Sequence, residues 1–387
     1  MKNLEKLIIE IRRHVHQHPE LGHKEFKTTA YIASILKTHN IAFKTLKPTG
    51  VLAWLPGKTP NKKPSKCIAI RADIDALPVT EKTNKPYSSK HLGIMHACGH
   101  DNHLAMVLGT ALNLAGRRKD LEEKNCCIKF IFQPNEESAG GAIKVVQQGA
   151  LINPKVDAIF GIHVSPGLES GQIGFKYGEM MAALITFEIE IYGGGGHTAY
   201  PHTGKDTILT ASEIVIALKS YVSKHINPAE PAVISIGTIK GGTRYNVFAD
   251  SIKMTGTFRT FSNNLIKQTP KIFNEIITSK TREFGLKHKF SYEINGHPVI
   301  NTDSLVDSAV KSSRKVLGKE KVIILKKPSM GGEDFSEYLR TTPGCFMYLG
   351  ASIKGVAKPW HHPEFDIDEK ILIKGTNILS QIVLDTI

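Results

Sequence analysis

Residues 95–104 read MHACGHDNHL and contain one thiol, three imidazoles and a carboxylate. Cys98 and His100 are two residues apart, a spacing that puts side chains on one side of an extended segment but on opposite sides of a helix. If both bind one site, they precede the apolar helix that follows, and Asp101 is then placed as its N-cap. An inert buried thiol is the alternative for Cys98 alone. With His100 beside it, the segment predicts a metal site.

Two neighbouring glutamates, Glu136 and Glu137, follow Pro134. In a regular strand they would face opposite ways, but after the proline we expect the backbone to turn, so that one carboxylate binds metal while the other approaches from beside it. Amide hydrolysis requires this division between a metal ligand and a free base that takes a proton from water. The alternative is an exposed acidic turn.

Histidines at two further places are candidate ligands. His163 ends an apolar strand, where a lone histidine is more often a satisfied core residue, but its position at the strand's carboxyl end favours ligation. His361 and His362 precede Pro363 in a loop, and one of them could bind metal while the other lies on the surface. Spacing alone does not choose between these two.

A glycine run at 193–196 precedes His197. Neither the dinucleotide-binding nor the P-loop spacing is present, so we do not expect phosphate binding. His197 could reach a cleft as a hydrogen-bond donor, and Asn246 and Arg259 could hold a substrate carboxylate, Arg259 with bidentate geometry. Taken singly, the last two would be ordinary strand-end and surface residues.

The elements that must position these residues follow an α/β pattern. Short apolar runs at 67–71, 126–132 and 156–162 alternate with helical patterns at about 102–115 and 141–148. This alternation predicts a catalytic α/β domain with a mainly parallel central sheet. Candidate residues follow the expected strands, and ligands of open α/β sheets bind outside the carboxyl ends of strands. The fold should therefore gather them in one cleft.

A second pattern begins at about residue 184. Strand, helix, strand, strand, helix and strand follow one another up to about residue 294, which is the ferredoxin-like α+β order. We therefore expect an inserted lid or dimerisation domain at 184–295, and one discontinuous metal-binding domain formed by 1–183 and 296–387.

Composition narrows the class of protein. The 387 residues carry a net charge of +14, but the lysines are spread along the chain without a nucleic-acid motif, so no nucleic-acid partner is expected. No apolar run reaches the roughly 18 residues that would indicate a membrane span. The N-terminus begins an amphipathic helix where a signal peptide would be apolar, and cytoplasmic residence is the default expectation. Five cysteines imply no disulfide framework.

Eight separated motifs together resemble the peptidase-family amidohydrolases, which include hippurate hydrolase, bacterial N-acyl-amino-acid amidohydrolases and plant hydrolases of auxin–amino-acid conjugates. The resemblance runs in order from about residue 12 to 370. The motifs are Arg13–Gly22 with Glu25, Arg71–Pro78 with Glu81, Met95–His103, Gln133–Glu137, Gly161–His163, Gly194–His202, Gly331–Ser336 and His361–Phe365.

This resemblance implies a catalytic domain with a dinuclear metal site and an inserted lid domain that often mediates dimerisation or higher homo-oligomers. It implies Glu136 as the general acid/base and His197 as a lid histidine that stabilises the oxyanion. The two divalent ions could be zinc, manganese, cobalt or nickel. The implied metal ligands are Cys98, which bridges the metals, His100, Glu137, His163 and His361, the last because the family ligand stands two residues before proline.

Two departures from the family pattern concern substrate range rather than metal chemistry. Tyr245–Asp250 stands where the family usually has Asn-Val-Ile-Pro-Asp, which keeps Asn246, and Asn102 stands where a small residue is common. Neither touches an implied ligand.

The leading hypothesis is a metal-dependent amidohydrolase that cleaves a small-molecule N-acyl-amino acid into a carboxylic acid and a free amino acid. Alternatives within the family are an N-acetyl-diaminopimelate deacetylase and a small dipeptidase. A different mechanism would make Cys98 a nucleophile with His100 or His103 as its base. A different class would be a non-catalytic amino-acid-conjugate binding protein, against which the retention of Glu136 argues.

Overall fold

The structure is a computed structural model that describes residues 2–56, 64–353 and 358–387. The chain divides into two compact units. The first comprises Met1–Met180, Ile300–Pro328 and Asp334–Ile387, and the second comprises Met181–Val299 with Ser329–Glu333. The second unit thus contains the segment expected as an insertion, begins slightly before it, and takes in a short segment from much later in the chain.

The first unit is built on an eight-stranded sheet. Its four central strands, β4, β3, β5 and β14, run parallel, and β1 and β2 extend the sheet in antiparallel fashion beyond β4. The predicted α/β fold with a mainly parallel central sheet is confirmed. In spatial order the strands are β1 (Ala42–Thr45), β2 (Val51–Leu55), β4 (Cys126–Gln133), β3 (Lys66–Asp73), β5 (Ala158–Glu169), β14 (Gly344–Ser352), β6 (Ile173–Phe175) and β13 (Val322–Ile324).

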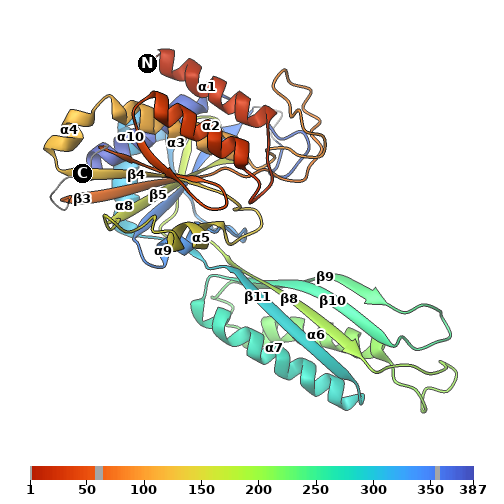
Figure 1. Ribbon diagram of the computed structural model, residues 1–387. Coiled ribbons are helices and arrows are strands. Elements are labelled where there is room, and N and C mark those ends of the chain that lie inside the picture. The colour runs from red at the N-terminus through yellow and green to blue at the C-terminus, as the bar shows by residue number, and fades with distance from the viewer. Residues whose placement is uncertain (1, 57–63, 354–357) are drawn as a thin grey trace. The chain divides into compact units, whose positions relative to one another are not determined.

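Helices cover both faces of this sheet. Figure 1 shows α1, α3 and α10 on one side and α5 and α9 on the other. Apolar residues of α1, such as Ile8 and Ile11, pack with Ile68 and Ile70 of β3 in one buried core. The helices of this unit are α1 (Lys2–Gln17), α2 (Phe26–Thr38), α3 (His100–Ala115), α4 (Arg118–Glu123), α5 (Gly141–Gln147), α8 (Asp303–Leu317), α9 (Ser336–Leu339) and α10 (Ile371–Thr386), with a 3₁₀ turn at Lys319–Lys321.

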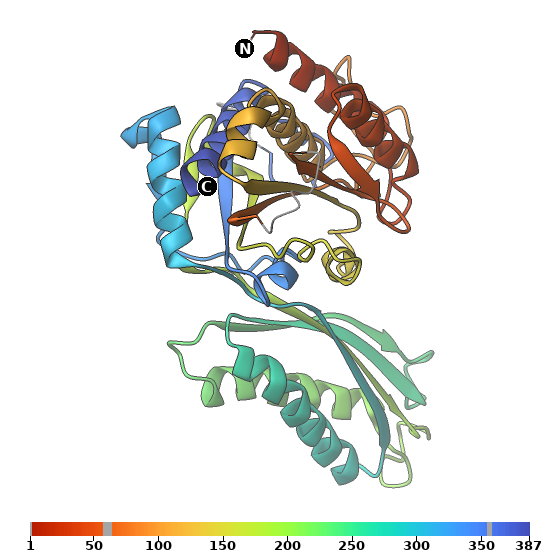
Figure 2. The same ribbon diagram turned by 60° about the vertical axis from the view of Figure 1, so that its left-hand side comes forward.

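The second unit is a four-stranded antiparallel sheet in the order β11-β8-β10-β9, with α6 and α7 on one face (Figure 2). Alternate residues of β8, including Ile185, Phe187 and Ile189, are buried against these helices, which explains the period of two in the sequence. The ferredoxin-like prediction is confirmed. The elements are β8 (Ala183–Tyr192), α6 (Thr207–His225), β9 (Ala232–Gly241), β10 (Ser251–Thr260), α7 (Asn263–Glu283) and β11 (Lys287–Gly296).

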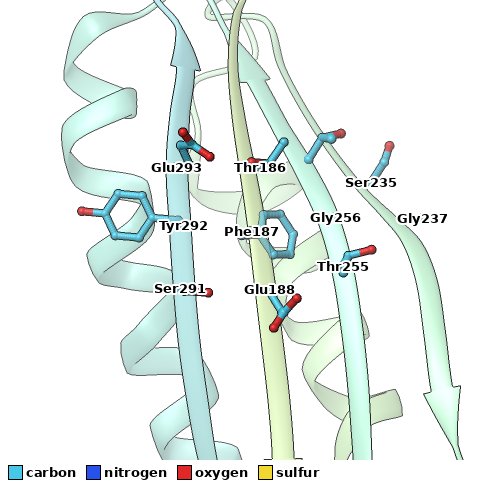
Figure 3. A pocket seen from close by; sticks show the side chains of 11 residues that line it. Thr186, Phe187, Glu188, Ser235, Gly237, Thr255, Gly256, Ser291, Tyr292 and Glu293 are labelled. Carbon is cyan, nitrogen blue, oxygen red and sulfur yellow. The ribbon is translucent and has the colours of Figure 1, made fainter. Parts of the chain in front are cut away.

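The opposite face of this sheet is open and polar. It is hollowed by a shallow cavity of about 590 Å³, lined by residues that include Glu188, Ser235 and Thr255 (Figure 3). Polar side chains are stable in contact with water, so this face of the sheet does not have to be buried by another helix or sheet. A separate two-stranded sheet pairs β7 (Gly178–Met181) with β12 (Val299–Asn301). Among the described residues, the helices are too short or too polar to cross a membrane.

Candidate metal centre

The backbone turns sharply between Cys98 and His100. The residue between them, Gly99, has φ 94°, and a Cβ at this position would lie 2.4 Å from Cγ2 of Val164. A left-handed conformation in so close a contact requires glycine. Because α3 begins at His100, the turn brings the Cys98 thiol beside the first residue of the helix.

Asp101 does not cap α3, and the prediction that it would was wrong. Gly99 occupies the cap position, and Asp101 lies in the first helical turn. Its carboxylate accepts hydrogen bonds from Nε of Arg12 at 2.7 Å and from Nδ1 of His16 at 2.8 Å. These bonds tie the start of α3 to α1, so Asp101 anchors the segment that carries His100.

His100 is oriented by a carboxylate. Its Nδ1 lies 3.2 Å from Oδ1 of Asp75, at the end of β3, and donates to it. Its Nε2 is buried without a hydrogen-bond partner among the described residues, 3.7 Å from both Oδ2 of Asp73 and Oε1 of Glu137. A histidine whose Nδ1–H is bonded to a carboxylate presents its other nitrogen as a metal ligand.

His163 and Cys98 face each other across the same space. Nδ1 of His163 donates to the backbone carbonyl of Val164 at 2.8 Å, and its Nε2 lies 3.6 Å from Sγ of Cys98. Burial holds the pKa of His163 well below its usual value, so the imidazole is neutral and its Nε2 carries a free electron pair. Burial also raises the pKa of the Cys98 thiol, and the nearby Glu137 and Glu136 raise it further.

The two glutamates occupy a turn, as expected. Asn135 has φ 55°, a left-handed conformation that ends β4 and reverses the chain before Glu136. The backbone N–H of Glu137 donates to Oδ2 of Asp75 at 3.0 Å. Both carboxylates are half-buried and both act on the Cys98 thiol, so neither lies in a freely exposed acidic turn.

The loop at 361–362 separates its two histidines. His361 has φ 67° and brings Nε2 to 3.4 Å from Oε1 of Glu137. His362 instead accepts a hydrogen bond on Nδ1 from the backbone N–H of Glu364 at 3.0 Å. Of the two, the structure brings His361 to the other candidate ligands.

The chemistry of this donor set fits a cation. Ligand atoms of Cys98, His100 and Glu137 all lie within 4.8 Å of one another. Oε1 of Glu137, like Nε2 of His100, is buried without a hydrogen-bond partner in the described parts of the chain. Burial acts to lower the pKa of His100, but Asp73, Asp75 and Glu137 raise it to about 10. The surrounding carboxylates therefore favour positive charge at this position, and a metal ion bound there would supply that charge in place of the proton on His100.

His103 also lies in this region but is fully occupied. Its Nδ1 donates to Oδ1 of Asp73 at 2.6 Å, and its Nε2 accepts from the backbone N–H of Val164 at 2.8 Å. It therefore has no free nitrogen for a metal or for a proton from Cys98. This geometry argues against His103 as the base of a cysteine nucleophile, whereas Nε2 of His100 has no hydrogen-bond partner among the described residues.

No role was assigned to Asp73 and Asp75 in the sequence analysis. Asp73 is fully buried, accepts from Arg71 Nη1 at 2.7 Å and fixes His103. Asp75 fixes His100 and the backbone of Glu137. Their position at the carboxyl end of a central strand was the signal that could have identified them.

The remaining candidates belong to the second unit. His197 is exposed and pairs through its backbone with Val247, next to Asn246, whose carbonyl accepts from the N–H of Thr198 at 3.3 Å. Arg259 is half-buried on β10 and donates from Nη1 to the carbonyl of Met330 at 2.9 Å. His197 and Asn246 thus lie on adjoining segments of this unit.

A sequence profile described as Peptidase family M20/M25/M40 matches residues 69–385. The chain belongs to this family. Among curated M20/M25/M40 relatives, the N-acetyl-L-cysteine deacetylase of Bacillus subtilis (strain 168) is 40% identical over 98% of this chain and 88% of its own length. The N-acetyldiaminopimelate deacetylase of Lactobacillus helveticus (strain DPC 4571) is 33% identical over 98% of both chains.

Solved structures agree with this membership. The YXEP protein of Bacillus subtilis, described as a dinuclear metal binding peptidase from the M20 family, is 35% identical over the full length of both chains, with a TM-score of 0.83. A putative aminohydrolase from methicillin-resistant Staphylococcus aureus is 32% identical, with a TM-score of 0.90, over 99% of this chain and 97% of its own.

Membership of this family confirms the prediction of an enzyme of the amidohydrolase class. It also counts against the alternative of a non-catalytic binding protein. The sequence-based resemblance to peptidase-family amidohydrolases is confirmed as well.

Proposed function

We propose that this enzyme hydrolyses the amide bond of N-acyl-amino acids and releases a carboxylic acid and a free amino acid. One observation carries the proposal: buried, unpartnered ligand atoms of His100 and Glu137 converge with Cys98, and a second carboxylate, Glu136, stands beside them. Such a site separates metal binding from proton transfer.

Two divalent metal ions would be held by Cys98, His100, Glu137, His163 and His361. When bound, the ions lower the pKa of water from about 15.7 towards 7 and polarise the amide carbonyl. Thiolate, imidazole and carboxylate ligands together suit zinc, manganese, cobalt or nickel. The M20 relative described as dinuclear supports the stoichiometry of two.

Glu136 would act as the general acid/base. Its carboxylate takes a proton from the attacking water and delivers it to the leaving nitrogen, which would otherwise depart as an unstable amide anion. The support for this role is that the charge of Glu136 acts on the Cys98 thiol, which places this second carboxylate near the proposed ligands.

The second unit would be the lid and the dimerisation domain, with His197 donating to the developing oxyanion. Asn246 and Arg259 would hold the substrate carboxylate. One support is that His197 is exposed on the segment adjoining Asn246. Another is the guanidinium of Arg259: burial lowers its pKa, but the ordinary pKa of arginine is so high that the group stays charged.

The names of the relatives support an N-acetyl-amino acid within this class. One acts on N-acetyl-L-cysteine and another on N-acetyldiaminopimelate, so both carry an acetyl group on an amino-acid nitrogen. A deacetylase of N-acetyl-diaminopimelate or a small dipeptidase would use the same site with a different pocket.

The test is release of free amino acid from N-acetyl-, N-benzoyl- and N-succinyl-amino acids, and from dipeptides, by chelator-stripped enzyme reloaded with manganese, zinc, cobalt or nickel. Turnover of an N-acyl-amino acid that depends on added metal supports the proposal and identifies the acyl group. Turnover of dipeptides alone, or no turnover of the panel by enzyme shown to contain metal, contradicts it.

A further inference from the structure

Two thiols lie side by side at the end of the sheet away from the candidate metal centre. Cys67 on β3 and Cys127 on β4 are partners in register, and the two parallel strands continue from them to Asp73 and Gln133. At about 3.3 Å per residue, the thiols are roughly 20 Å from those strand ends. They are therefore separate from the site described above.

Both side chains point to one face of the sheet, because residues paired in register on neighbouring strands share a face. Cys67 is 1% exposed and Cys127 is 5% exposed. The adjacent Cys126 points the opposite way, into the large apolar core, where its thiol donates to the carbonyl of Leu121. Cys67 and Cys127 thus form a pair from which Cys126 is excluded.

Cys127 opens on a cavity of about 420 Å³ whose lining includes Trp54, Lys44 and Lys129. A small solute that enters this space reaches the thiol of Cys127, while Cys67 is not part of the lining. A solute in the cavity can therefore reach Cys127 but not Cys67. A pair in which one thiol reacts with a solute and the other then attacks the product requires this difference in access.

The cavity wall carries fixed positive charge. The ammonium group of Lys129, two residues after Cys127 on the same face of β4, donates to the carbonyls of Ala150, Ile152 and Pro154 at 3.1, 2.7 and 2.9 Å. Lys44 donates to the carbonyl of Gln148 at 3.0 Å. These bonds hold both cations in place, and a thiolate is stabilised in such an environment.

The electrostatics of the pair act in the same direction as its difference in access. A bond from Cys67, together with the charge of Lys129, lowers the pKa of Cys127 despite its burial. The same bond, with burial, raises the pKa of Cys67. Because Cys127 lines the cavity and Cys67 does not, Cys127 is the thiol that a solute meets first.

A bond between the two sulfurs is geometrically accessible. Neighbouring strands lie about 4.7–4.9 Å apart, and the Cα atoms of disulfide-bonded cysteines are usually about 4.4–6.8 Å apart. Partners in register on β3 and β4 therefore lie within the Cα separation of a disulfide.

We propose that Cys67 and Cys127 form an oxidisable dithiol, which hydrogen peroxide converts to a disulfide across β3 and β4. The Cys127 thiolate attacks one peroxide oxygen, the O–O bond breaks, and hydroxide leaves and takes a proton from solvent. The Cys67 sulfur then attacks the Cys127 sulfur, the S–O bond breaks, and the Cys67 proton leaves with the hydroxyl group as water. The two sulfurs lose two electrons in all, and one peroxide becomes two water molecules.

The experiment uses the full metal-loaded chain, in which none of the five cysteines begins in a disulfide. After exposure to hydrogen peroxide and quenching with catalase, the protein is denatured, alkylated with iodoacetamide and mapped by mass spectrometry. We expect the number of alkylated cysteines to fall from five to three. We also expect a peptide pair joined through Cys67 and Cys127, which dithiothreitol separates.

Variants provide the controls. Cys126→Ser should leave the loss of two thiols intact, whereas Cys67→Ser and Cys127→Ser should abolish the cross-link. The mapping of the unaltered chain decides the matter if a variant fails to fold. Five alkylated cysteines after peroxide, a cross-link through Cys126, or Cys127 sulfinic acid with Cys67 still alkylated would each overturn the proposal.

Discussion

His100 donates a hydrogen bond from Nδ1 to Oδ1 of Asp75 over 3.2 Å. The other oxygen of the same carboxylate accepts from the backbone N–H of Glu137 at 3.0 Å. One side chain at the end of β3 therefore orients two proposed ligands that come from different parts of the chain. Asp75 thus sets both which nitrogen of His100 is free and where the Glu137 segment lies.

Replacing Asp75 by Asn should weaken metal binding. An amide can still accept one of the two hydrogen bonds, but its NH₂ group cannot accept the other, so one of the two ligands loses its support. We expect metal affinity to fall roughly 10–100-fold, measured by competition with a chromophoric chelator. Asp120→Asn, an exposed change on α4, is the control. Equal affinities in the two variants would remove Asp75 from this role.

Replacing Glu136 by Gln should separate chemistry from metal binding. The amide keeps the size of the side chain but cannot take a proton from water, so turnover should fall roughly 10²–10⁴-fold while metal content is unchanged. Ser138→Ala, in the same turn and exposed, should retain activity. A Glu136→Gln enzyme with near-normal turnover would show that another group performs the proton transfer.

Replacing His197 by Ala should lower kcat. If His197 donates to the developing oxyanion, its loss should cost roughly 10²–10³ in turnover, with metal content and folding unaffected. His202→Ala changes another exposed histidine of the same loop and should have little effect. An effect of His197→Ala on KM alone would instead indicate a role in ground-state binding.

Glu81 should contribute stability that acid removes. Burial acts to raise the pKa of Glu81, but hydrogen bonds from His16, Thr83 and the backbone of Ser89, with the charge of His16, lower it to about 2. A depressed folded-state pKa gives stability that is present above the unfolded value of about 4.5 and is lost as the pH falls through 2. Each pKa unit corresponds to about 1.4 kcal/mol, so the contribution near neutral pH is up to about 3 kcal/mol.

Urea unfolding of the wild type and of Glu81→Gln at pH 6 and pH 3 measures this contribution. The difference in unfolding free energy between the two proteins should be largest at pH 6 and should shrink by more than half at pH 3. A difference that is the same at both pH values would mean that Glu81 acts through its shape rather than its charge.

The sequence predicted the elements well where periodicity was strong. Alternation in Ile185, Phe187 and Ile189 identified β8, and the apolar stripe after His100 identified α3. The start of α3 was predicted wrongly because Asp101 has the side chain of a cap, and its actual partner, Arg12, lies far away in the chain. Local pattern cannot anticipate a partner that depends on how α1 packs.

Cys98, Glu137 and His361 were predictable as reactive side chains in bends and turns, but the strand expected to end at His163 continues past it to Glu169. The groups that orient them, such as Asp75, could be placed at the same edge of the sheet, but their hydrogen-bond partners could not be assigned. For example, His103 donates to Asp73 through one ring nitrogen and accepts from the backbone N–H of Val164 through the other. Both bonds depend on β3 lying beside β5 in the sheet. Strand order is a property of the tertiary fold, so the residues that support a site require the structure.

Metal titration of the stripped enzyme tests the central claim most directly. Turnover of the best N-acyl-amino acid and bound metal are measured together as manganese or zinc is added in steps, with His100→Ala as a parallel sample. The account predicts no turnover without metal, and activity that rises with occupancy and saturates at two ions per chain. Replacing His100 should reduce both occupancy and turnover. Full turnover by metal-free enzyme, or wild-type occupancy in the His100→Ala protein, would contradict it.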